Sequence, residues 1–201
     1  MRRIWYTVPT MAFNPRQVDH ILNQATPVVC PAAQLVARWR NQTLFDRAYG
    51  WSDPDECRRP TTTETRFDLA SVTKISGPLP GLMLLEGMGR FSHMDRLGKY
   101  APAMRGSDKA DLWLQDILAH QAGLYPWIPF WQETVKRNGD FKRRLVSSYP
   151  SEKYSLVMAD HLYLQDKFKK KIYRTIRKSE LGEKEYRYSG LSFFLFPGII
   201  E

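Results

Sequence analysis

Phe67 to Lys74 read FDLASVTK, and the apolar stretch ISGPLPGLMLLEGMG continues the chain to Gly89. A serine hydroxyl is a poor nucleophile unless a nearby base takes its proton. Because residues three apart share one helical face, Lys74 can reach Ser71 if a helix begins near Ser71. The helix N-terminus would also place partial positive charge beside an anion forming there. This pattern indicates a nucleophile and its base, although a serine that only caps the helix, with Lys74 in solvent, fits the same spacing.

The sequence on either side of this segment predicts a mixed chain of helices and strands. Pro78 and Pro80 predict a kink just beyond Lys74, because proline removes a helical hydrogen bond. The predicted elements are a helix over Asn14–Ala25, a hairpin over Ala33–Gly50, a surface loop over Trp51–Thr65, a buried helix over Leu79–Met88, an amphipathic helix over Asp111–His120 and a basic helix over Lys167–Lys178.

Composition excludes a wholly disordered chain, since 43% of the 201 residues are hydrophobic. The charge is strongly basic, with 30 Lys and Arg against 21 Asp and Glu. Most of the excess lies between residues 132 and 187, so nucleic-acid binding through Lys167–Lys178 is one hypothesis. Phe168, Ile172 and Ile176 fit a packed helix face better, and no recognised binding motif accompanies them. We therefore expect no nucleic-acid partner.

Membrane, secretion and metal signals are absent from the sequence. No window approaches the roughly eighteen apolar residues of a membrane span, and MRRIWYTVPTMAF lacks the apolar core of a signal peptide. Cys30 and Cys57 stand apart and the four histidines are scattered, which predicts no metal site. No organic cofactor is expected either. The redox state of the two cysteines and the oligomeric state stay open.

FDLASVTK resembles the active-site segment of the serine β-lactamase and penicillin-binding protein superfamily, nearest the branch of class C β-lactamases, esterases and D-alanyl-D-alanine carboxypeptidases. Three further segments resemble family segments in the right order. AAQLVARWRNQTLFDRAYGW resembles the first two strands, DILAHQAGL resembles L-L-T-H-x-S-G-L, and YRYSGLSFFLF resembles the Y-x-N segment. The resemblance covers roughly residues 25–201.

The resemblance implies an α/β (α+β) fold of the β-lactamase/transpeptidase type. An antiparallel sheet would be flanked by helices, with an α-helical subdomain that carries Ser71 and Lys74. Residues 1–24 would form an N-terminal extension and helix. Residues 25–201 would form the N-terminal part of the family domain, with a basic insertion at about 126–187.

The resemblance also implies roles for single residues. Ser71 would be the acylated nucleophile and the source of one oxyanion-hole N–H, Lys74 would help to deprotonate it, and Tyr188 would relay the proton to the leaving group. The implied function is a serine acyl hydrolase acting on D-Ala peptides, β-lactams or small esters. The implied partner is a small molecule or cell-wall peptide, and the implied location is the periplasm or cell envelope.

Two departures from the family pattern support an alternative. Gly190 stands where the family often has asparagine, so Ser189 and Gly190 are candidate substrate-binding positions, although a turn role for Ser189 is an equal alternative. No K-T-G or H-x-G segment follows Tyr188. We therefore expect an incomplete sheet in a truncated chain. The alternative function is a non-catalytic or degenerate member that binds cell-wall peptide or a partner.

Overall fold

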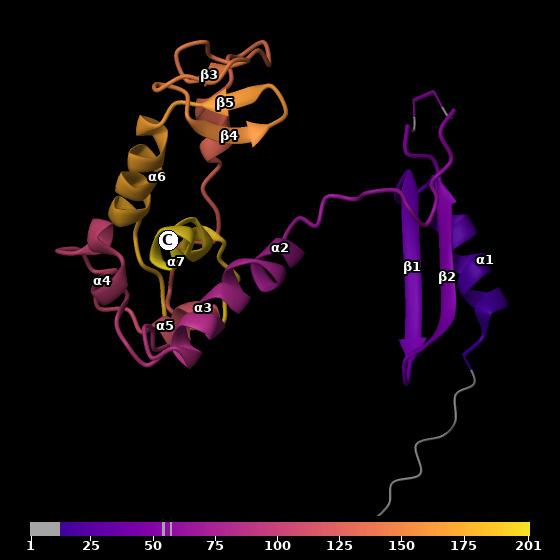
Figure 1. Cartoon of the computed structure of the whole chain (residues 1–201), viewed down its shortest axis with the longest axis horizontal. Coiled ribbons are helices and arrows are strands. Elements are labelled where there is room, and N and C mark those ends of the chain that lie inside the picture. The colour runs from indigo at the N-terminus through magenta and orange to yellow at the C-terminus, as the bar shows by residue number, and fades with distance from the viewer. Residues whose placement is uncertain (1–12, 54, 57) are drawn as a thin grey trace, which may run out of the picture. The chain divides into compact units, whose positions relative to one another are not determined.

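The computed structural model describes residues 13–53, 55–56 and 58–201. The chain separates into two compact units, Met1–Asp68 and Leu69–Glu201, each with its own antiparallel sheet (Figure 1). This mixed architecture of helices and small antiparallel sheets confirms the predicted fold class. The sheet is incomplete, as expected. The predicted extension over residues 1–24 is described only from residue 13, and Cys57 lies outside the described residues.

The first unit holds α1 (Pro15–Ala25) and the hairpin of β1 (Ala32–Trp39) and β2 (Gln42–Gly50), as predicted. Asn14 caps α1, because its side chain accepts the backbone N–H groups of Arg16 and Gln17. Arg40 and Asn41 both have positive φ, of 45° and 65°, which suits a tight hairpin turn.

The second unit is mainly helical and contains the main hydrophobic core. Leu97, Met104, Leu114 and Ile176 are fully buried in that core. The predicted helix over Asp111–His120 is shorter, because only Leu114–Leu118 is α-helical. The helices are α2 (Val72–Ser76), α3 (Pro78–Gly87), α4 (Leu97–Tyr100), α5 (Leu114–Leu118), α6 (Lys167–Lys178) and α7 (Pro197–Ile200), and the 3-10 turns are η1 (Pro102–Met104), η2 (Phe130–Glu133) and η3 (Leu191–Phe194).

The predicted break after Lys74 is present, since α2 ends at Ser76 and α3 begins at Pro78. The predicted burial of the next helix is wrong. Met83 and Leu84 are 63% and 61% exposed, and in α3 only Leu82 is fully buried. Within the second unit α3 contacts α7, and this contact does not cover Met83 and Leu84.

A small antiparallel sheet lies within the predicted basic insertion. It consists of β3 (Val146–Ser147), β4 (Leu156–Ala159) and β5 (Leu162–Leu164), in the order β3-β5-β4 (Figure 1). The sequence analysis did not predict this sheet. α6 follows β5 directly and packs its Phe168 and Ile176 into the core, as the spacing of its apolar residues predicts. No described helix is both long and apolar enough to span a bilayer.

Candidate active site

Ser71 stands at the first turn of α2, and its hydroxyl faces two other polar groups. Ser71 occupies the N-cap position, but its side chain makes no capping hydrogen bond. Its Oγ instead accepts hydrogen bonds from Lys74 Nζ at 3.1 Å and from Tyr188 OH at 2.9 Å. The structure therefore brings together the three residues predicted to be catalytic, although Tyr188 is 117 residues from Ser71 in sequence.

The three groups form a polarised cluster. Hydrogen bonds with Ser71, and then with Lys74, hold the pKa of Tyr188 below its ordinary value, and the charge of Lys74 acts in the same direction. Lys74 Nζ lies 5.5 Å from the ring centroids of both Tyr188 and Phe193, so its ammonium group is also held by aromatic faces. Tyr188 is 46% exposed, which leaves the cluster open to a ligand.

His120 fixes the segment that carries Tyr188, a connection that sequence reasoning missed. Its carbonyl accepts the Arg187 N–H at 2.9 Å, and its Nδ1 accepts the Ser189 N–H at 3.3 Å. The His120 ring also packs on the Tyr188 ring with centroids 4.5 Å apart. Burial, and then the charge of Lys74, lower the pKa of His120, which favours the neutral ring. His120 thus holds the residues on both sides of Tyr188.

Ser189 and Gly190 differ in what they offer a ligand. Ser189 is 3% exposed; its hydroxyl donates to the Tyr125 carbonyl at 2.7 Å and accepts the Leu191 N–H at 3.3 Å. Both bonds lie inside the protein, which favours the turn role over substrate contact. At Gly190 an added Cβ would lie 3.8 Å from Lys74 Cε. A side chain there would therefore reach Lys74, and glycine provides none.

Two backbone features flank the nucleophile and its partner. Ala70, directly before Ser71, has φ of 43°, and His120 has φ of 58°. Non-glycine residues rarely adopt this left-handed conformation, and such strain concentrates at functional sites.

The side chains described give no sign of a metal centre. No three His, Cys, Asp or Glu side chains gather in residues 13–53, 55–56 and 58–201.

Comparisons with known proteins give one matching family model and two curated relatives. Residues 25–201 match the model of the family described as Beta-lactamase. The chain is 28% identical over 199 residues to the "Putative D-alanyl-D-alanine carboxypeptidase" of Escherichia coli (strain K12), covering 92% of this chain and 40% of that protein. It is 31% identical over 123 residues to the "N-acetylmuramyl-L-alanine amidase" of Bacillus subtilis (strain 168), covering 54% of this chain and 27% of the amidase.

Solved structures share the fold at low sequence identity. The octameric penicillin-binding protein homologue from Pyrococcus abyssi superposes with a TM-score of 0.65 at 18% identity, covering 92% of this chain and 38% of that chain. EstCE1, a hydrolase with promiscuous acyltransferase activity, superposes with a TM-score of 0.59 at 19% identity, covering 92% and 45%. The chain thus spans less than half the length of each of these relatives.

Proposed function

Because the chain belongs to the beta-lactamase family, we propose that it is a serine acyl hydrolase whose acyl-enzyme forms on Ser71. One observation carries the proposal, namely that Ser71 Oγ lies within hydrogen-bond distance of both Lys74 Nζ and Tyr188 OH. Covalent catalysis requires a nucleophile beside a base, and a third group that polarises the base. Ser71, Tyr188 and Lys74 have this arrangement.

The proposed reaction begins with attack of Ser71 Oγ on a carbonyl carbon. The Ser71 proton passes to the Tyr188 phenolate, which the Lys74 ammonium group stabilises, and the Ser71 N–H binds the oxyanion. The tetrahedral intermediate collapses when the bond to the leaving nitrogen or oxygen breaks and Tyr188 returns the proton to that atom. Water then attacks the Ser71 ester, releases the acid and restores the serine hydroxyl.

The proposed substrate is a D-Ala-containing peptide of the cell wall, with β-lactams and small esters as smaller acyl donors. The name of the carboxypeptidase relative supports a D-Ala peptide, and the name of the amidase relative supports a cell-wall substrate more generally. The same names support action in the periplasm or cell envelope. The exposure of Tyr188 is compatible with a large, polymer-linked substrate.

Gly190 supports a second candidate function, in which the chain binds a cell-wall peptide without turning it over. Glycine provides no side chain beside Lys74, whereas the family's asparagine would be adjacent to its ammonium group. A substrate amide would then lack one hydrogen-bond partner, and Lys74 would lack one group that orients it.

Labelling with a fluorescent penicillin or a fluorophosphonate distinguishes the two candidates. We expect the wild-type chain to be labelled and Ser71→Ala to remain unlabelled. Ser76→Ala is the matched control, because Ser76 lies on the same helix and its hydroxyl donates to the Val72 carbonyl. Labelling of Ser71→Ala at the wild-type rate would refute a nucleophilic role. Binding of a D-Ala peptide without any labelling would favour the non-catalytic function.

A further inference from the structure

α6 combines a buried apolar side with a densely cationic side. Seven of its twelve residues are Lys or Arg and none is acidic. Phe168 and Ile176 are buried, and Ile172 and Tyr173 pack against the same core. The apolar residues therefore satisfy the packing of the helix, and packing alone does not require so many cations on the other side.

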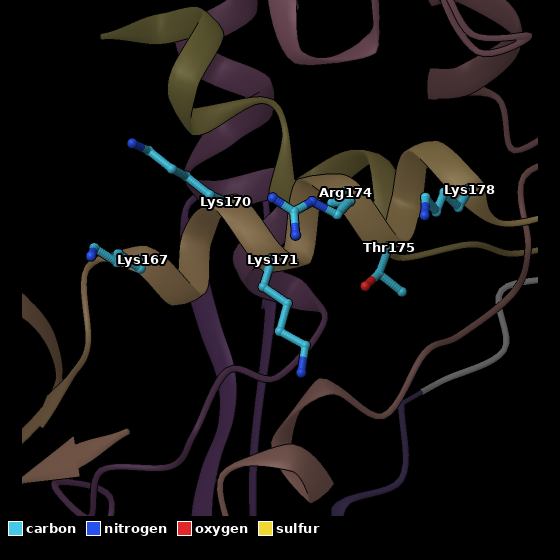
Figure 2. A pocket seen from close by; sticks show the side chains of 6 residues that line it. All are labelled: Lys167, Lys170, Lys171, Arg174, Thr175 and Lys178. Atoms are coloured by element: carbon cyan, nitrogen blue, oxygen red, sulfur yellow. The ribbon is translucent and has the colours of Figure 1, made fainter. Parts of the chain in front are cut away.

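The cations line one continuous hollow on the helix surface. Figure 2 shows the side chains projecting from α6 along its length. They span the twelve residues of the helix, or about 16 Å along its axis. The hollow has a volume of about 660 Å³, and we call its lining residues the α6 basic face: Lys167, Lys170, Lys171, Arg174, Thr175 and Lys178.

Little acidic charge balances the α6 basic face. Among the residues described, Lys171 alone of its five cations forms an ion pair, with Glu133. Like charges three and four residues apart on a helix repel one another. Lys167 also lies in the first turn, where the helix dipole disfavours a cation. An anion bound along this face would relieve both kinds of repulsion.

The positive surface continues beyond α6. A neighbouring hollow of about 440 Å³ shares Lys171 with the α6 basic face and is also lined by three further cations, Lys142, Arg144 and Lys153, and by one carboxylate, Glu133, which pairs with Lys171. In the other direction, Glu180 adjoins Lys178 and brings negative charge. The favourable path for an anion therefore runs from Lys178 along α6 toward the small sheet.

We propose that the α6 basic face binds a flexible polyol-phosphate polymer, at a site separate from Ser71. Several phosphates in a row match cations repeated along a helix, and each contact releases counterions. Nucleic acid fits less well, because Phe168 and Tyr173 belong to the core side and leave no aromatic platform for bases. A membrane surface fits less well, because no apolar side chain lines the hollow for insertion.

The test measures binding of fluorescently labelled poly(glycerol phosphate) to the full chain by anisotropy at several salt concentrations. We expect the logarithm of the affinity to fall linearly with the logarithm of salt concentration. The double substitution Lys170→Glu with Arg174→Glu should weaken binding at least about tenfold and reduce the salt slope by roughly two. Lys170→Gln with Arg174→Gln should cause a smaller loss in the same direction.

Arg90→Glu with Lys184→Glu is the matched control, since it changes net charge equally at exposed positions off this face. We expect its affinity to stay within about twofold of the wild type, because neither residue lines the α6 basic face and salt screens the interactions of exposed charges. Circular dichroism checks that every variant is folded. Equal affinity of the charge-reversed double variant and the control would overturn the proposal. Tighter binding of poly(dT) or of anionic phosphatidylglycerol vesicles than of poly(glycerol phosphate) would also overturn it.

Discussion

The hydroxyl of Ser71 accepts hydrogen bonds from two donors, Lys74 Nζ and Tyr188 OH. Neither group can accept the Ser71 proton in that state, so the reactive form must differ from it by one proton. Tyr188 is the group whose pKa is lowered by its neighbours, chiefly Ser71 and Lys74. Its phenolate beside the Lys74 ammonium group is therefore the form that we expect to react.

The rate of acylation should rise with pH, because the group that accepts the Ser71 proton must first be deprotonated. We expect the labelling rate of the wild-type chain to rise with pH through a midpoint below the usual pKa of tyrosine, which is about 10. Lys74→Met should move this midpoint upward and slow labelling at neutral pH by about a hundredfold or more, since it removes the stabilising cation. Stopped-flow measurement of the labelling rate across pH gives both the midpoint and the rate at neutral pH. An unchanged midpoint would contradict the role given to Lys74.

His120 should act through position rather than by proton transfer. His120→Gln removes the ring that packs on Tyr188, and we expect labelling to slow by about ten- to a hundredfold because the phenol loses its placement. The pH midpoint should stay within experimental error, since the base itself is retained. His93→Gln, at an exposed histidine bonded to Glu86, is the control. A shift of the pH midpoint in His120→Gln would show that His120 itself titrates in the reaction.

At the scale of elements, α6 and the hairpin each combine packed side chains with charged contacts. α6 buries Ile176 completely while its opposite side carries the cations, so the two sides can be altered separately. In the first unit, Tyr49 OH donates to Asp19 Oδ1 at 2.6 Å, and Arg47 pairs with the same carboxylate. These contacts tie α1 to β2.

The core side of α6 should determine stability. Ile176→Ala is expected to lower the free energy of unfolding by about 2–5 kcal/mol, because it removes buried methyl groups and leaves a cavity. Lys170→Ala, on the exposed side, should change it by no more than about 0.5 kcal/mol. Urea unfolding followed by circular dichroism gives both values. Similar losses for the two variants would show that the helix is not packed as described.

The contact between α1 and β2 should weaken at alkaline pH. Burial, and then the hydrogen bond to Asp19, raise the pKa of Tyr49 to about 12. This stabilisation is complete below the unfolded-state pKa of about 10 and is lost as the pH rises toward 12. Relative to Tyr49→Phe, the wild type should therefore lose thermal stability between these pH values. Tyr149→Phe, at an exposed tyrosine, should show no such difference, and a pH-independent effect of Tyr49→Phe would contradict the prediction.

Several elements were predictable because their signals are local. The i, i+3 spacing predicts that Lys74 reaches Ser71, and Arg40 with Asn41 in a polar turn predicts the hairpin. No spacing could place Tyr188 beside Ser71 across 117 residues, and only the family resemblance suggested it. The link from His120 to Tyr188 likewise depends on tertiary contacts. The apolar run of α3 predicts a helix but does not say which neighbours cover it.

The small sheet escaped prediction for a different reason. Its strands contain two, four and three residues, too few to show an alternating pattern. The segment LVMADHLYL does carry a hairpin signal, because two apolar runs flank Asp160 and His161. His161 has φ of 51°, which suits that turn.

At the scale of the whole molecule, all three proposed catalytic residues belong to one compact unit, residues 69–201. The chain spans 40% and 27% of its two curated relatives. The geometry at Ser71 thus supports acylation as a property of this unit, and turnover of wall peptides is the further proposal.

The most direct test of acylation at Ser71 is mass spectrometry of the intact chain after incubation with benzylpenicillin, followed by peptide mapping. We expect a gain of one whole penicillin molecule, because opening of the β-lactam ring releases no leaving group, and we expect it on Ser71. An unmodified chain, or an adduct on another residue, would contradict the account.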